Sequence, residues 1–219
     1  MKDYFIDLGT MEGNYMIRSC LNDLINHSRK KEIMLFPGTL LEKREGYSTV
    51  TMPIICEGEI IGRRRKLTSL PYIDDWNETL KIYSNEDLSV NGSIILFEEP
   101  FKSIYDKIRN IQKFEALESI KNFEKDSHRI LPIICNEIEL IPKYYSKAPV
   151  DVIVHSSYNH FLNEKKRIMC YKKVAQKFKT FGVTEEEFFI ISCEEGNSSC
   201  NNIYKIQGDS IKLYNRRDI

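Results

Sequence analysis

The chain has 219 residues, of which 42% are hydrophobic and 11% aromatic, so it can bury a sizeable core and disorder is not expected. Lys plus Arg and Asp plus Glu both number 32, and the formal net charge of zero argues against nucleic-acid binding and against an anionic membrane surface. No segment approaches the ~18 apolar residues of a membrane span. The N-terminus lacks a signal-peptide run and the six cysteines include no CxxC pair, so we expect a cytoplasmic protein with free thiols.

The first residues predict a strand, a helix and a second strand, the unit of a layered α/β protein. DYFIDLG (3–9) alternates as a strand does, and Asn14 can cap the helix that follows. EIMLFPG (32–38) is a short apolar run stopped by Pro-Gly, which indicates a buried strand ending in a loop. The expected apolar stripe of the helix is Met16, Ile17, Cys20, Leu21, Leu24 and Ile25, and its basic last turn is Arg29, Lys30 and Lys31.

The middle of the chain predicts a hairpin, a strand and a long helix. Residues 47–56 and 58–67 read as two strands joined near Glu57-Gly58, and SIILFEEP (93–100) as another strand. Residues 101–124 are polar with apolar residues at helical spacing, which predicts an amphipathic helix. Its expected apolar face is Ile104, Ile108, Ile111, Phe114 and Leu117.

The last third alternates strands with one helix. RILPIIC (129–135) predicts a strand, although Pro132 suits an edge or a first residue better than a central position, and VDVIVHSS (150–157) predicts a buried strand. A helix over about 164–181 should stop at Gly182. Its expected apolar face is Ile168, Tyr171, Val174, Phe178 and Phe181. EFFIISC (187–193) and a hairpin over 202–214, turning at Gly208-Asp209, complete the strands.

No linker or low-complexity tract divides the sequence, so one domain over 1–219 is the simplest organisation. HSSYNHF (155–161) could line a pocket, but a polar loop is the favoured interpretation. His155 and His160 lie five residues apart, which is not the spacing of a zinc-binding helix, and we predict no metal site.

Cys135 is the first candidate for chemistry. It ends the apolar run ILPIIC and is followed by Glu137, so the predicted strand delivers its thiol to the C-terminal edge, where α/β proteins bind ligands. A helix beginning just after it would favour the thiolate. The alternative is a core thiol in a core strand, as we expect for Cys56 in the similar run MPIIC, and spacing alone favours that alternative.

The dense basic run Arg63, Arg64, Arg65 and Lys66 is the second candidate. Charged residues commonly protect an edge strand, which is one interpretation. The other is that one cation points inward as the partner of an oxyanion or carboxylate. The sequence does not choose between them.

Three blocks in chain order resemble the carbon–nitrogen hydrolase superfamily of nitrilases and aliphatic amidases. They are IMLFPG (33–38), GRRRKLTSLP (62–71) and LPIICNEIELIP (131–142), which are similar to the family's Phe-Pro-Glu, Arg-Lys-Leu and Ile-Cys blocks. VDVIVHSS (150–157) looks like the family's next strand. The resemblance covers most of the chain and implies a four-layer α-β-β-α sandwich, with association into a homodimer through helical faces.

The resemblance also implies a covalent mechanism that needs no cofactor. Cys135 would be the nucleophile that attacks a small amide or nitrile, and Lys66 would stabilise the charge that develops in the tetrahedral intermediate. Glu137 would support the nucleophile loop. A thioester acyl-enzyme would form, and water would release the acid.

One departure from the family bears on activity. The general base of the family is the Glu of Phe-Pro-Glu, and this chain has Gly38 there. General acid–base assistance is worth roughly 10²–10⁴ in rate, so its loss should cripple turnover. Four acidic residues could take the place of this base, although none matches a family motif: Glu42, Glu45, Asp74 and Asp75. Asn136 replaces the aromatic residue after the nucleophile, and Pro142 comes about one residue late.

Three hypotheses therefore remain open. The first is a thiol amidase-like hydrolase with a displaced base. The second is a degenerate member of the same fold that binds a small amide-like ligand or a protein partner, which Gly38 favours. The third is an α/β protein unrelated to the family.

Overall fold

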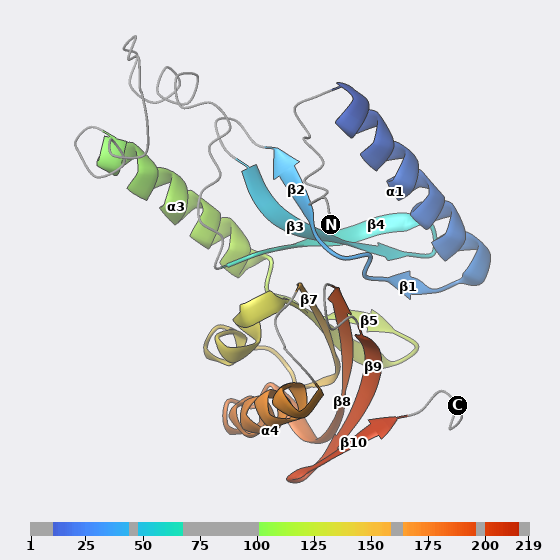
Figure 1. Ribbon diagram of the computed structural model, residues 1–219, viewed down its shortest axis with the longest axis vertical. Coiled ribbons are helices and arrows are strands. Elements are labelled where there is room, and N and C mark those ends of the chain that lie inside the picture. The colour runs from blue at the N-terminus through green and yellow to red at the C-terminus, as the bar shows by residue number, and fades with distance from the viewer. Residues whose placement is uncertain (1–10, 44–47, 68–100, 159–163, 196–199, 215–219) are drawn as a thin grey trace. The chain divides into compact units, whose positions relative to one another are not determined.

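The computed structural model describes residues 11–43, 48–67, 101–158, 164–195 and 200–214 (Figure 1). The chain forms two compact units, Met1–Ser119 and Ile120–Ile219, and each contains helices and a sheet. The mixed α/β class predicted from the sequence is therefore confirmed, whereas the four-layer sandwich and the single domain over 1–219 stay predictions. The strands predicted over 3–9 and 93–100 lie outside the described residues.

The first unit contains a four-stranded antiparallel sheet built around β3 (Ser48–Cys56). β1 (Met34–Leu35) and β2 (Leu40–Lys43) pair with successive parts of β3, and β4 (Glu59–Arg65) also pairs with it. The predicted hairpin is confirmed: Glu57 and Gly58 have φ of 51° and 90°, and two successive positive φ values are typical of a type I′ turn. The Phe-Pro-Gly segment lies between β1 and β2.

Helix α1 (Met11–Lys31) packs on this sheet and ends in the predicted basic turn. Its predicted start was wrong, because Asn14 lies inside the helix: Met11 and Glu12 are good helix formers and extend it upstream of the possible cap. The helix closes at Glu32, where φ is 53° and the Ile33 amide donates to the Ser28 carbonyl at 3.2 Å. The Arg29 guanidinium then donates to the Gly58 carbonyl at 3.1 Å, which ties the helix end to the β3–β4 turn.

Helix α3 (Phe101–Glu118) packs against β4 and ends earlier than the predicted residue 124. Ser119 explains the early end, because its hydroxyl donates to the Ala116 carbonyl at 2.7 Å and accepts from the Arg65 amide at 2.9 Å. The predicted apolar face was wrong in part. Phe114 is 65% exposed, and the buried side of the helix carries Ile108, Gln112 and Ala116.

The second unit contains a six-stranded sheet in the order β10-β9-β8-β7-β6-β5 (Figure 1). The three central strands run parallel, and the flanking pairs are antiparallel. The strands are β5 (Phe123–Lys125), β6 (His128–Ile134), β7 (Val150–Tyr158), β8 (Thr184–Glu195), β9 (Cys200–Gln207) and β10 (Ser210–Tyr214). The buried strand near 150–157, the strand near 187–193 and the final hairpin at Gly208 were predicted correctly.

Strand β6 accommodates a proline near its middle. Pro132 aligns with Val154 of β7, whereas the pairing with β5 on the other side reaches only Ile130. Within the described residues Pro132 therefore lies along an edge-like section of β6, where its missing amide breaks no strand pairing. This agrees with the expectation that Pro132 suits an edge, although it is not a first residue.

Helix α4 (Glu164–Thr180) packs against β8 and β10 and ends as predicted, with Gly182 at φ 66°. Tyr171, Val174 and Phe178 form its buried face, and the Phe178 ring meets that of Phe188 on β8 edge to face. Phe181 lies beyond the helix and is 51% exposed, so its predicted place on that face was wrong. Among the described residues, no helix is long and apolar enough to cross a membrane.

Candidate active site at the end of strand β6

Cys135 lies at the C-terminal end of β6, where the sequence predicted a thiol. The strand ends at Ile134, one residue earlier than predicted, and Cys135 is the first residue of the short 3-10 helix η2 (Cys135–Glu139). Its side chain is half-buried. Because β6 is followed directly by η2, the chain turns sharply at this residue.

The backbone of Cys135 has a left-handed conformation, with φ at 53°. The other described non-glycine residues with positive φ all occupy ordinary turns: Glu32 follows the end of α1, Glu57 is in the β3–β4 turn, and Asp126 and Ser127 form the β5–β6 turn. Cys135 instead joins a strand to a 3-10 helix. Strained backbone of this kind costs about 1–3 kcal/mol and concentrates at functional sites, which distinguishes Cys135 from Cys56.

A chain of buried polar groups runs from Cys135 through the interior of the second unit, to which Cys135 itself belongs. His155 Nε2 donates to the Cys135 carbonyl at 2.8 Å, and His155 Nδ1 lies 2.9 Å from the Tyr171 hydroxyl. The Tyr171 hydroxyl in turn lies 2.8 Å from the Ser192 hydroxyl. His155, Tyr171 and Ser192 are fully buried, and they belong to β7, α4 and β8. Three elements of the unit therefore contribute to one chain of contacts, which reaches the backbone of Cys135 through His155.

Glu137, the predicted supporting residue, lies in the same 3-10 helix as Cys135. It is fully buried, and its backbone carbonyl accepts from the Leu140 amide at 2.8 Å, which closes η2 before η3 (Ile141–Lys143). Glu139 faces outward in the same helix and lies 3.7 Å from the Lys177 ammonium of α4. The two acids after Cys135 thus differ in burial.

A second polar cluster lies at the start of α4. Tyr204 of β9 donates to a Glu164 carboxylate oxygen at 2.6 Å, and the buried Arg167 guanidinium pairs with the same carboxylate. Burial, reinforced by the hydrogen bond to Glu164, raises the pKa of Tyr204 to about 12. Tyr204 therefore stays neutral across the physiological range.

The basic run of β4 separates into residues with different surroundings. The guanidinium of Arg64 is fully buried and donates to the Ser119 hydroxyl at 3.3 Å, so one cation of the run does point inward. Arg65 lies within ion-pair distance of Glu42 and Glu115. Lys66 directly follows β4, is half-buried, and donates its amide to the Val50 carbonyl at 2.8 Å.

Lys66 belongs to the first unit and Cys135 to the second, and each unit is described by itself. The pairing of the Lys66 ammonium with the Cys135 thiol therefore stays a prediction. The structure does place Cys135 and Glu137 together in one helix turn.

Glycine occupies the position of the expected general base, so this position offers no side chain, and its backbone conformation is also unusual. Gly38 has φ of 94°, a conformation that residues with a Cβ rarely adopt. Glu42, one of the possible substitutes, accepts from the Thr51 hydroxyl at 2.9 Å and lies 3.5 Å from the Arg65 guanidinium. The substitutes Glu45, Asp74 and Asp75 lie outside the described residues.

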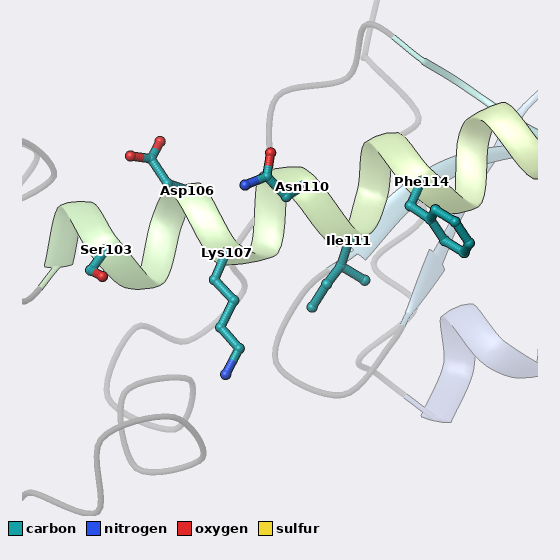
Figure 2. Close-up of a pocket in the computed structure, with 6 residues that line it drawn as sticks. All are labelled: Ser103, Asp106, Lys107, Asn110, Ile111 and Phe114. Atoms are coloured by element: carbon teal, nitrogen blue, oxygen red, sulfur yellow. The ribbon is translucent and has the colours of Figure 1, made fainter.

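A surface hollow of about 630 Å³ lies along α3 in the first unit, and Figure 2 shows the residues that line it. Its lining residues are Ser103, Asp106, Lys107, Asn110, Ile111 and Phe114. They include no nucleophilic thiol, and we assign this hollow no part in a cysteine-dependent reaction.

The main features that sequence reasoning missed are the partners of Cys135. The favoured interpretation of HSSYNHF as a polar loop was wrong for residues 155–158, because His155 is a buried strand residue. The signal was available in part: a histidine inside a buried apolar strand needs a hydrogen-bond partner, and Tyr171 on the buried face of the next helix offers one. Among the described residues, no cluster of His, Cys, Asp and Glu could hold a metal ion.

Comparison with known proteins gives structural matches without sequence matches. No protein-family model and no curated protein matches the chain. Glutamine-dependent NAD+ synthetase from Acinetobacter baumannii, solved with ADP, matches with a TM-score of 0.50 and 12% identity. That match covers 92% of this chain and 32% of the synthetase, so the chain spans about a third of that protein.

Two further structures match at lower scores. An amidase mutant from Nesterenkonia sp. AN1, described with the acetamide moiety of fluoroacetamide added to its active-site cysteine, has a TM-score of 0.47 and 11% identity over 90% of this chain and 65% of the amidase. The NAD(+) synthetase from Cytophaga hutchinsonii has a TM-score of 0.46 and 11% identity over 90% of this chain and 30% of its own. At these identities the comparisons bear on the fold alone.

Proposed function

Because the chain has a divergent carbon–nitrogen hydrolase fold, we propose that it is a cysteine-dependent hydrolase of a small amide or nitrile. The observation that carries the proposal is the left-handed backbone of Cys135, at 53°, where β6 meets η2. A nucleophile on a sharp, strained turn after a strand is held out from the sheet, toward an incoming electrophile.

The proposed reaction begins with attack of the Cys135 sulfur on the carbonyl carbon of an amide. A C–S bond forms, and the Lys66 ammonium stabilises the charge on oxygen in the tetrahedral intermediate. The C–N bond then breaks, and the leaving nitrogen takes the proton that the thiol gave up. Water attacks the thioester, the C–S bond breaks, the carboxylic acid is released, and the second proton of the water regenerates the thiol. The sequence of steps needs no cofactor.

Glu137 is proposed to support the nucleophile turn rather than to react. A fully buried carboxylate in the first turn of η2 suits an anchoring role, because burial keeps it from bulk water and from exchanging partners. Its replacement by Gln keeps the shape and one of the two acceptor oxygens, so Glu137→Gln should be tolerated better than Glu137→Ala.

A second candidate function rests on Gly38 and Glu42. Position 38 supplies no carboxylate, and Glu42, the described substitute, already accepts a hydrogen bond from Thr51 and lies beside Arg65. The same fold would then bind an amide-like ligand or a protein partner without turnover. The homodimer and the cytoplasmic location stay predictions under either function.

The rate of thiol alkylation separates the two functions. The full chain is treated with iodoacetamide, which carries an amide beside its reactive carbon, and peptide mass spectrometry follows each cysteine. The hydrolase proposal predicts that Cys135 is alkylated at least tenfold faster than Cys56 and that Lys66→Ala reduces this preference. Equal rates at the two cysteines would contradict it and favour the binding function.

A further inference from the structure

The buried polar chain behind Cys135 consists of His155, Tyr171 and Ser192, and we call it the His155 relay. It is continuous from a backbone carbonyl on η2 to a hydroxyl on β8, through contacts of 2.8, 2.9 and 2.8 Å. All three side chains are fully buried. Polar groups withdrawn from water destabilise a fold unless they are hydrogen-bonded, and apolar residues of similar size would fill the same space. Packing alone therefore does not explain why these three polar side chains are buried here.

The direction of the hydrogen bonds follows from the first contact. A carbonyl oxygen only accepts, so the ring nitrogen facing Cys135 carries the proton, and Nε2–H is the donor. The Tyr171 oxygen lies 2.9 Å from the other ring nitrogen, Nδ1, and the Tyr171 hydroxyl donates to the Ser192 hydroxyl at 2.8 Å. The ring is therefore held at both nitrogens, with the Nε2–H donor pointed at the Cys135 carbonyl.

The carbonyl that the relay holds belongs to the strained residue itself. With φ at 53°, Cys135 lies outside the favoured regions, and it stays there only if its surroundings hold it. A fixed carbonyl restricts rotation about the Cα–C bond, and the direction of the Cα–Cβ bond that carries the sulfur follows from that frame. The ring is itself fixed, because β7 supplies its backbone and α4 supplies Tyr171.

We propose that His155 is a positioning residue for the Cys135 nucleophile, acting through the Cys135 carbonyl, and that Tyr171, itself bonded to Ser192, holds the His155 ring in the orientation that points Nε2–H at that carbonyl. The inference rests on the proposed function, because it assumes that the thiol reacts. It assigns His155 no proton transfer with the thiol, since both ring nitrogens are engaged elsewhere, one with the carbonyl and one with Tyr171.

The test compares alkylation by iodoacetamide in three variants of the full chain. Tyr171→Phe removes one hydroxyl of the relay and keeps the ring. Tyr145→Phe is the matched control, because Tyr145 is also a buried tyrosine of the second unit, and its hydroxyl donates to the Ala148 carbonyl at 2.8 Å. His155→Gln places an amide donor where Nε2 lies, and so should keep part of the contact with the Cys135 carbonyl.

The expected result is specific to one cysteine. Tyr171→Phe should slow alkylation of Cys135 about tenfold, His155→Gln should slow it less than Tyr171→Phe does, and Tyr145→Phe should stay within threefold of the wild type. The neighbouring thiols Cys170 on α4 and Cys193 on β8, both half-buried, report on general loosening and should react at unchanged rates in all variants.

Two outcomes would overturn the inference. If Tyr171→Phe leaves Cys135 alkylation unchanged, the relay does not position the nucleophile. If alkylation of Cys135, Cys170 and Cys193 rises together, the relay only stabilises the unit. A wild-type chain in which Cys135 reacts no faster than Cys56 is a different result, because it contradicts the proposed function before any variant is compared.

Discussion

Cys135 and Cys56 form a natural pair for testing whether the backbone at the candidate nucleophile is strained. Each follows Pro-Ile-Ile, and each is half-buried near the end of a strand, but only Cys135 has a positive φ. A left-handed conformation costs a residue with a Cβ about 1–2 kcal/mol, and glycine avoids that cost. In an ordinary strand glycine has the opposite effect, because replacing alanine by glycine there lowers the free energy of unfolding by about 0.5–1 kcal/mol.

The comparison is between the alanine and the glycine variant at each site, which removes the sulfur from both. From these magnitudes, glycine at position 135 should raise the free energy of unfolding by about 0.5–1 kcal/mol relative to alanine, and glycine at position 56 should lower it by a similar amount. The two alanine-to-glycine differences should thus have opposite signs. Urea denaturation followed by circular dichroism measures all four variants. If glycine destabilises both sites equally, Cys135 is not strained, and the reasoning that makes it a nucleophile is refuted.

Three further predictions concern the fold and the expected base. Gly58→Ala should lower the free energy of unfolding by about 1–3 kcal/mol, because φ is 90° and a Cβ would lie 2.4 Å from Arg29 Nε. Gly208→Ala is the control: φ is 56° and nothing described lies within 4 Å, so the loss of unfolding free energy in urea denaturation should be smaller. Gly38→Glu should not restore a base, because the φ of 94° at this position strains a residue with a Cβ. The free energy of unfolding should fall by about 1 kcal/mol, and Cys135 should be alkylated no faster than in the wild type. A faster rate would show that position 38 does face the thiol. Tyr204, whose pKa is raised to about 12, should favour folding fully below pH 10 and lose that contribution as pH rises through 12, because only the neutral phenol suits its buried site. The difference in tyrosinate absorbance between the wild type and Tyr204→Phe isolates this residue among the 12 tyrosines, and a difference transition near pH 10 would contradict the burial argument.

Local patterns predicted the turns and most of the strands. Glu57-Gly58 and Gly208-Asp209 carry glycine where a tight hairpin needs positive φ, and both hairpins are present. The β5–β6 hairpin was missed because its turn residues, Asp126 and Ser127, include no glycine, and the segment before them was assigned to a helix. The early end of α3 depends on the Ser119 hydroxyl and its contact with Arg65, a partner 54 residues away that no local pattern reveals.

The candidate site was predicted in part for a similar reason. The apolar run ILPIIC correctly placed Cys135 at the end of a strand, since buried parallel strands are nearly continuous in apolar residues. Its positive φ could not be read from the sequence, because a cysteine gives no local signal for a left-handed backbone. His155 was visible as a residue but not as a partner, since its contacts with Cys135 and Tyr171 depend on how β6, β7 and α4 pack.

The basic run shows the limit of a charge pattern. Four consecutive cations at 63–66 could not be assigned to surface or interior from their letters. Alternation along β4 buries Arg64, while Arg65 lies beside Glu42 and Glu115. Lys66 is the first residue after the end of β4, so neither strand periodicity nor the resemblance to a family settles where its ammonium lies.

The most direct test of the central claim, that Cys135 is an acylated nucleophile, is the mass of the chain during exposure to substrates. The full protein is mixed with a panel of small aliphatic amides and nitriles, quenched in acid, and digested for peptide mass spectrometry. The account predicts a thioester on the peptide that contains Cys135, absent in Cys135→Ala and retained in Cys56→Ala. An acyl group that forms on Cys56 as readily as on Cys135, or no acyl group on any cysteine across the panel, would contradict it.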